Sequence, residues 1–139
     1  MPENYDILRV SLNFYINSAV LQSTLEERLE RKVGDRYGPA GNKNLIYYLN
    51  DLNVPKMDEY QTICTHTILR QHLDHKHWYD RQKLTLKVIE NCQYIATMKP
   101  NFGNPVNQRL QRHFSQFAIS MPSQVNIFII YFTLIYYFI

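Results

Sequence analysis

Hydrophobic residues near the start of the chain follow a period of two. Leu8, Val10, Leu12 and Phe14 alternate with polar residues, which places the apolar side chains on one face. This alternation predicts a half-buried strand over residues 7–14.

The spacing then changes to that of a helix. Leucines recur at every fourth residue from Leu21 to Leu29, and Val33 continues the stripe. The pattern predicts an amphipathic helix over residues 18–33, which Gly34 would end.

Residues 34–44 are rich in glycine, proline and asparagine, so they predict a loop. The unbroken apolar run at residues 45–49 follows. A short run bounded by turn signals is typical of a strand that is covered on both faces. We therefore expect this strand in the interior of a sheet.

Further elements are predicted along the rest of the chain. They are a helix from Asp58 to Leu73, a short strand at 83–87, a strand at 94–98, a short helix at 108–113 and a strand at 116–120. Strands and helices thus alternate. This order predicts an α/β domain with a mostly parallel sheet and flanking helices.

Composition excludes several classes of protein. The 139 residues carry a net charge of +3, and the basic residues are spread along the chain without forming a nucleic-acid stripe. The two cysteines, Cys64 and Cys92, make no disulfide framework and are predicted to be buried thiols. A reducing, cytoplasmic setting is the expectation.

One strand end carries candidate nucleotide chemistry. The apolar run at 45–49 ends in Asn50 and Asp51. P-loop ATPases use a carboxylate at such a strand end to hold magnesium beside the phosphates. The alternative is that these residues are polar only because strand ends meet solvent.

Two other motifs have weaker support. Residues 38–43 look like a phosphate-binding loop, but Asn42 separates Gly41 from Lys43, and the segment precedes a strand, so we interpret it as a surface loop. The histidines at 72, 75 and 77 follow no common zinc spacing, so no metal site is predicted.

Four segments together resemble the axonemal dynein heavy chain. They are residues 37–55 (YGPAGNKNLIYYLNDLNVP), 69–87 (LRQHLDHKHWYDRQKLTLK), 91–98 (NCQYIATM) and 108–114 (QRLQRHF). The likeness runs from about residue 2 to 122 and resembles the third of the six AAA+ modules in that motor ring. It implies an incomplete AAA+ P-loop-type sheet over residues 1–122 and an unrelated apolar tail over 123–139.

The resemblance implies roles for five residues. Asn50 stands where the family carries the magnesium-side aspartate, and Asp51 keeps the carboxylate that positions water. Lys99 takes the place of the sensor asparagine. Arg109 and Arg112 match two family arginines, and Arg109 is the better candidate for reaching a neighbouring module's nucleotide. The alternative is that both arginines are solvated or paired within the chain.

The resemblance also implies limits. The family's Walker A loop and its strand would lie before Met1, so we expect weak or no binding of ATP and magnesium, and no hydrolysis, by this chain alone. In the family order five-one-four-three-two, strand 7–14 lies at one edge. Strand 94–98 then has an exposed edge, because its missing neighbour would lie there.

The tail is uncharged and apolar from residue 127 onward. It is shorter than the roughly 20 residues of a membrane-spanning helix, and its β-branched and aromatic content favours a strand. Three interpretations stay open: translated non-coding sequence, a short membrane anchor, or a segment that folds back over the sheet edge.

Three functions remain from the sequence. The first is a piece of the ATP-driven microtubule motor of cilia and flagella, located in the axoneme and contacting AAA+ modules, dynein subunits and microtubules by resemblance. The second is an interaction polypeptide that docks on AAA+ or dynein subunits. The third is a short membrane-associated peptide.

Overall fold

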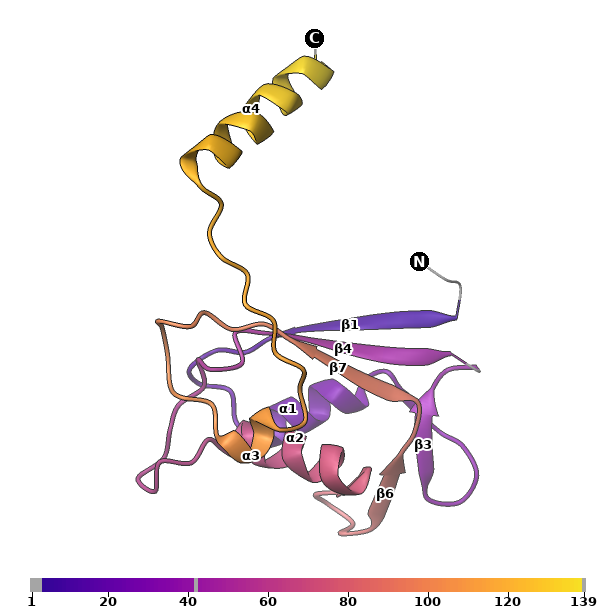
Figure 1. The fold of residues 1–139 in the computed structure, drawn as a ribbon. Helices are drawn as coiled ribbons and strands as arrows, with labels where there is room; N and C mark the ends of the chain where they lie inside the picture. Colours follow the sequence, from indigo (N-terminus) through magenta and orange to yellow (C-terminus); the bar gives the residue numbers. More distant parts are fainter. Residues whose placement is uncertain (1–3, 42, 139) are drawn as a thin grey trace.

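The computed structural model describes residues 4–41 and 43–138 (Figure 1). The strands are β1 (Tyr5–Ser11), β2 (Leu29–Arg31), β3 (Arg36–Pro39), β4 (Asn44–Asn50), β5 (His77–Tyr79), β6 (Leu86–Ile89) and β7 (Cys92–Ala96). The helices are α1 (Ser18–Glu26), α2 (Cys64–His75), α3 (Gln108–Gln111) and α4 (Gln124–Phe138).

A parallel sheet of order β1-β4-β7 forms the centre of the domain. Side chains of β4 alternate strictly, and Leu45, Tyr47 and Leu49 are fully buried. The α/β class, the three predicted strands and their neighbour order are confirmed. The edges differ by two or three residues, since β1 and β7 begin and end earlier than their apolar patterns suggest.

A second sheet, of order β2-β3-β6-β5, corrects two predictions. Helix α1 ends at Glu26, well before residue 33, because the backbone from Leu29 to Arg31 pairs antiparallel with β3. The expected loop at 34–44 contains β3 for the same reason. Val33, the supposed end of the apolar stripe, is 84% exposed in the turn between these strands.

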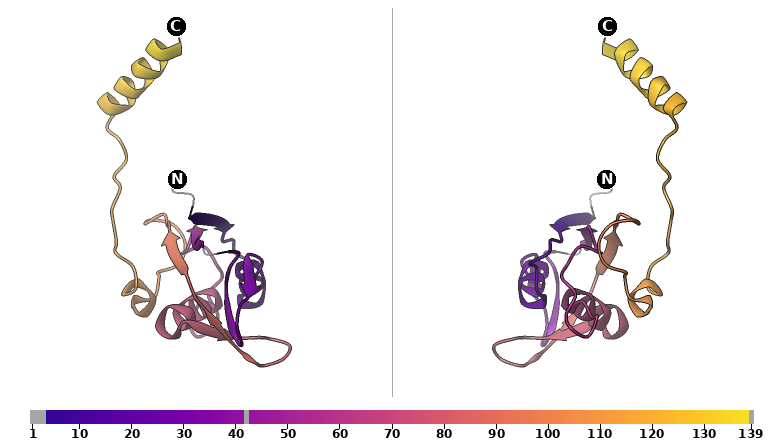
Figure 2. Two further views of the ribbon diagram at one scale, coloured as in Figure 1. Left: turned by 90° about the vertical axis from the view of Figure 1, so that its right-hand side faces the viewer. Right: turned by 90° about the vertical axis from the view of Figure 1, so that its left-hand side faces the viewer.

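Helices α1, α2 and α3 cover one face of the central sheet (Figures 1 and 2). Helix α2 begins at Cys64 rather than at Asp58, because Asp58 holds a local turn instead. Its Oδ1 accepts from the backbone N–H groups of Tyr60 and Thr62 at 3.0 and 2.7 Å. The core lies between these helices and the buried positions of β1, β4 and β7.

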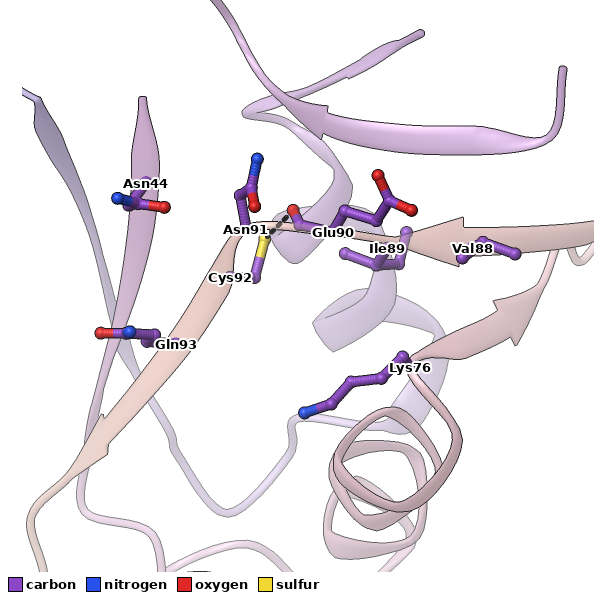
Figure 3. A pocket seen from close by; sticks show the side chains of 8 residues that line it. All are labelled: Asn44, Lys76, Val88, Ile89, Glu90, Asn91, Cys92 and Gln93. Atoms are coloured by element: carbon purple, nitrogen blue, oxygen red, sulfur yellow. Dashed lines mark hydrogen bonds between the residues drawn. The ribbon is translucent and has the colours of Figure 1, made fainter. Parts of the chain in front are cut away.

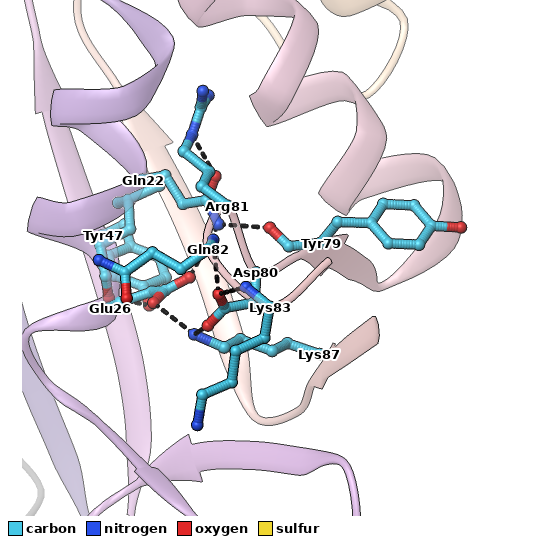
Figure 4. Close-up of polar contacts among 10 residues, drawn as sticks. Gln22, Glu26, Tyr47, Tyr79, Asp80, Arg81, Gln82, Lys83 and Lys87 are labelled. Atoms are coloured by element: carbon cyan, nitrogen blue, oxygen red, sulfur yellow. Dashed lines mark hydrogen bonds and ion pairs between the residues drawn. The ribbon is translucent and has the colours of Figure 1, made fainter. Parts of the chain in front are cut away.

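A partly buried ion cluster joins α1 to the β5–β6 hairpin (Figure 4). The Lys87 Nζ lies 2.8 Å from Glu26 and 2.7 Å from Asp80. Burial disfavours charge on Lys87, but its bonds to both carboxylates outweigh that effect and raise its pKa. The predicted strand at 83–87 is displaced to 86–89, because Asp80 caps a turn through the N–H groups of Gln82 and Lys83.

The last part of the chain departs most from expectation. Residues 116–120 form no strand, and the tail folds as helix α4 rather than as a strand. Neither a strand nor a helix of the tail covers the edge of β7 (Figure 1). Within the described part of the chain, no helix is long and apolar enough to cross a membrane.

A buried histidine lies at the junction of α2, β5 and β7. The Nδ1 of His72 is 2.6 Å from the Tyr94 hydroxyl, and the imidazole packs edge-on against Trp78. Burial lowers the pKa of His72 to about 4, and the charge of Lys76 adds to this effect. The folded protein therefore holds this histidine neutral at pH 6.

We predict that the free energy of unfolding decreases as the pH is lowered from about 6.5 to 4. In this range His72 is protonated in the unfolded chain but stays neutral in the folded chain. Each such proton contributes at most about 1.4 kcal/mol per pH unit to the slope. Urea unfolding at pH 7.5 and 5.5 measures this change in the free energy of unfolding. Both pH values lie above the range in which carboxylates titrate.

The variant His72→Gln should lose part of this slope, and His75→Gln, on the exposed side of the same helix, is the matched control. An equal slope in the parent and His72→Gln would contradict the assignment. The buried His66, whose pKa is also lowered by burial, accounts for the slope that remains.

Candidate functional site at the carboxyl ends of the parallel strands

The ends of β4 and β7 bring polar side chains together. The backbone N–H of Thr97 donates to Leu49 at 2.9 Å, and the N–H of Leu52 donates to Thr97 at 2.9 Å. These bonds align the residues that follow the two strands. The Thr97 hydroxyl then donates to Asn50 Oδ1 at 2.7 Å.

Asn50 and Asp51 are linked to each other. The Asn50 amide Nδ2 donates to Asp51 Oδ2 at 3.0 Å, and both residues are half-buried. Asp51 has a positive φ of 59°, an unusual conformation for a residue other than glycine. Strain of this kind is common at functional sites, where the surrounding structure enforces it.

These three residues offer one charged ligand for a metal. Magnesium prefers carboxylate oxygens in near-octahedral geometry, usually with several waters retained. Here Asn50 Oδ1 already accepts from Thr97, and one Asp51 oxygen accepts from Asn50. The set therefore does not fit direct magnesium coordination by two carboxylates, although Asp51 retains an oxygen for a bound water.

Lys99 follows β7 on a loop that hydrogen bonds from Asn53 hold in place. Its side chain is exposed, with Nζ 5.9 Å from the centre of the Phe102 ring. The buried Asn53 holds the loop, because its amide donates to the carbonyl oxygens of Lys99, at 2.9 Å, and of Phe102. The Lys99 backbone is thus anchored beside the end of β4, while its exposed ammonium group lies near the Phe102 ring.

The two arginines of α3 differ in their surroundings. The Arg112 guanidinium lies 2.6 Å from Asp74 Oδ1 on α2, and His113 lies 3.0 Å from the same oxygen. Arg109 is exposed, and among the described residues it forms no ion pair. Pairing within the chain, the alternative considered for both arginines, is found for Arg112.

Thr97 and Asn53 were not among the residues predicted for this site. Thr97 is the polar residue directly after the apolar run of β7, so its place at the strand end was a usable signal. Asn53 carried none, because an asparagine after a strand suggests an exposed turn, whereas this one is 4% exposed. Its loop contacts lie 46 and 49 residues away in sequence.

Other candidate residues lie away from this edge. Gly38 and Pro39 belong to β3, so the segment resembling a phosphate-binding loop joins two strands and leads into no helix.

Cys64 is exposed, which corrects the prediction of a buried thiol, while Cys92 is half-buried and burial raises its pKa to about 11. Over residues 4–41 and 43–138, no three His, Cys, Asp or Glu side chains are grouped to hold a metal.

An open hollow of about 470 Å³ lies at the opposite end of the sheet (Figure 3). Its lining residues are Asn44, Lys76, Val88, Ile89, Glu90, Asn91, Cys92 and Gln93. Asn44 begins β4, and Cys92 begins β7, so the hollow faces the amino ends of the strands. Ligands of open α/β sheets bind outside the carboxyl ends, which favours the edge at Asn50 and Asp51.

Comparison with known proteins agrees with this geometry. Residues 1–122 match the family described as P-loop containing dynein motor region. Human Dynein axonemal heavy chain 17 is 52% identical over 134 residues, which are 96% of this chain and 3% of that protein. The ciliary Dynein beta chain of Tripneustes gratilla is 49% identical over 132 residues, or 94% of this chain and 3% of that protein.

A more distant relative extends the same pattern. The Dynein alpha chain, flagellar outer arm, of Chlamydomonas reinhardtii is 44% identical over 126 residues, or 89% of this chain and 3% of that protein. The parallel three-stranded sheet with its helices is consistent with part of a P-loop α/β domain. The chain belongs to the family of P-loop containing dynein motor regions. It spans only 3% of the length of these relatives, and a division at residue 122 stays a prediction.

We predict that Gly103 is required to hold the Lys99 loop. Its φ is +82°, and a Cβ there would lie 2.5 Å from the Asn53 carbonyl oxygen. Gly103→Ala should lower the free energy of unfolding by about 3 kcal/mol, since left-handed strain and a backbone clash add. Gly34→Ala is the matched control. It has a φ of +66° and an open surrounding, so it should cost about 1 kcal/mol.

Urea denaturation of both glycine variants measures the difference. Equal losses in the two variants would show that the loop moves away freely and that Asn53 does not fix it.

Proposed function

We propose that this chain is part of the third AAA+ module in the motor ring of an axonemal dynein heavy chain. Within the ring the module responds to nucleotide and regulates the motor's grip on microtubules, and the chain alone is not catalytic. The observation that carries the proposal is the polar edge at the carboxyl end of β4, in a chain whose first 122 residues match the dynein motor region. The printed names of the relatives support the axonemal assignment. The segments at 37–55 and 69–87 support the position in the ring.

In this proposal the nucleotide's terminal phosphates lie outside Asn50, Asp51 and Lys99. Lys99 supplies a mobile positive charge on a fixed backbone, and Asp51 positions water. Asn50 brings no charge to magnesium, because it is an amide that is already hydrogen-bonded to Thr97 and Asp51. In the whole ring the module therefore senses ATP with little hydrolysis of its own, whereas this chain alone binds ATP weakly or not at all.

Arg109 is proposed as the residue that reaches the neighbouring module's nucleotide. Its exposure and the lack of an ion pair within the described chain support this role. Arg112 is instead proposed to hold α3 against α2 through Asp74. Contact with other ring modules and, through the whole motor, with microtubules follows from the same assignment.

The nucleotide edge is tested by grafting residues 1–122 into the matching segment of human Dynein axonemal heavy chain 17. We expect Asn50→Asp to tighten magnesium-dependent binding of an ATP analogue by about tenfold, the factor that corresponds to about 1.4 kcal/mol. Asn44→Asp makes the same change at the other end of β4 and should leave binding unchanged. Equal effects of both substitutions would contradict the proposed edge.

The proposed roles of Arg109 and Arg112 are distinguished by alanine variants of the same grafted motor. Arg109→Ala should reduce ATP-dependent microtubule gliding by at least about tenfold, because an arginine that stabilises the charge of a transferring phosphate typically contributes about 10³-fold or more to the rate of that step. Arg112→Ala should chiefly lower the thermal stability of the segment. A motor that tolerates Arg109→Ala but stops with Arg112→Ala would reverse the assignment.

The exposed Arg109 also favours a second candidate, in which the separate chain docks on an intact AAA+ or dynein subunit. Binding of the 139-residue chain to a purified dynein motor region, measured by biolayer interferometry, distinguishes the two. Tight binding that Arg109→Ala abolishes supports docking, and no binding leaves the ring module as the function.

A further inference from the structure

In the described part of the chain, no helix covers the face of the central sheet opposite α1, α2 and α3, and apolar side chains gather at its centre. Ile7 of β1 pairs with Ile46 of β4, and in the next row Tyr48 of β4 pairs with Ile95 of β7. Ile95 is 50% exposed, and the other three are half-buried. We call these four residues the outer face.

The outer face has the composition of a surface that another element covers. Side chains on a strand alternate between two faces, and the core-facing set of β4 is fully buried. A sheet that is solvated on one side normally carries polar residues there. Arg9 and Gln93 are the polar residues at the ends of these two rows. They lie on the edge strands β1 and β7, where a long side chain reaches water beside a covering element.

Helix α4 has the matching property. Its 15 residues contain no charge. From Ile127 to Phe132 every side chain is apolar or aromatic, and each is at least 48% exposed. A helix that is hydrophobic on all sides is normally buried. An isolated helix of this length is marginal in water, so α4 needs a packing partner.

The dimensions of α4 and the outer face agree. Fifteen helical residues span about 22 Å, and the seven-residue strands β1 and β4 span about 23 Å. Figures 1 and 2 place α4 on the side of the sheet opposite α1, α2 and α3. Residues 115–123 form no helix or strand, and nine such residues reach up to about 30 Å.

We propose that α4 of the same chain docks on the outer face and acts as a removable cover of the central sheet. The tether keeps α4 at a high local concentration near that face, which favours it over a second copy of the chain. Docking buries the apolar side chains of Ile46, Tyr48 and Ile95 against those of α4. The extended arrangement is then the open state, in which the outer face is available to other parts of a motor ring.

Crosslinking of the 139-residue chain tests this contact. The variant Ile95→Cys with Phe128→Cys is made in a Cys64→Ser background and treated with a short bismaleimide. The control is Leu84→Cys with Phe128→Cys, because Leu84 is 76% exposed in the turn between β5 and β6, which belong to the second sheet. The background without new cysteines reports any reaction of Cys92.

We expect an intramolecular crosslink, seen as a faster band in denaturing gels, for the Ile95 pair and not for the Leu84 pair. Equal crosslinking of both pairs would show an undirected tail. Crosslinks only between chains would identify a second copy as the occupant. Either result, or no crosslink at all, overturns the proposal.

Hydrogen exchange supplies an independent readout. The backbone amides of α4 should exchange at least about tenfold faster in Ile95→Glu than in the parent, because a charge on the outer face releases the helix. Leu84→Glu should leave their exchange unchanged, and unaltered protection of β4 shows that the variants are folded. Protection of α4 that arises only when phosphatidylcholine vesicles are added would instead make a membrane surface the occupant.

Discussion

The burial of β4 between two parallel neighbours is the constraint on which the rest of the domain depends. Leu45, Tyr47 and Leu49 are fully buried, and Tyr47 both stacks on Tyr94 and donates to the Leu25 carbonyl at 2.9 Å. One strand thereby fixes β1, β7 and α1 together. Because a slip of one residue would turn every buried side chain outward, the register of β4 is strongly determined.

That register also fixes the candidate site. With Leu49 buried, Asn50 must emerge at the carboxyl end of the strand, next to the residue that follows β7. The Thr97, Asn50 and Asp51 chain of hydrogen bonds is therefore a consequence of core packing. The Lys99 loop depends on the same strand end, because a hydrogen bond from Asn53 and the close approach of Gly103 to the Asn53 backbone hold it there.

Local patterns predicted the parts of the fold that packing alone determines. Strand β1 follows from alternating apolar residues, and strands β4 and β7 follow from apolar runs. The α/β class and the carboxyl-end position of Asn50 and Asp51 follow from these strands. The second sheet did not, because β2 and β3 pair through backbone groups of Leu29–Arg31 and Arg36–Pro39, whose side chains resemble a helix end and a loop. The prediction for the tail was wrong for another reason. Its residues favour strands, but no strand in the described part of the chain pairs with it, and a helix satisfies its backbone hydrogen bonds within the segment itself. The ion pair of Arg112 joins it to Asp74, 38 residues away in sequence, which no local spacing encodes.

The central claim is that Asn50, Asp51 and Lys99 face a nucleotide in a dynein ring. The most direct measurement is a cryo-electron microscopy structure of a heavy-chain motor that carries this segment, prepared with a non-hydrolysable ATP analogue. The account predicts terminal-phosphate density within hydrogen-bonding distance of Lys99 and next to Asp51, with Arg109 extended toward the adjoining module. An intact ring that shows no nucleotide at this edge, or phosphate bound instead at the hollow beside Asn44 and Lys76, would contradict it.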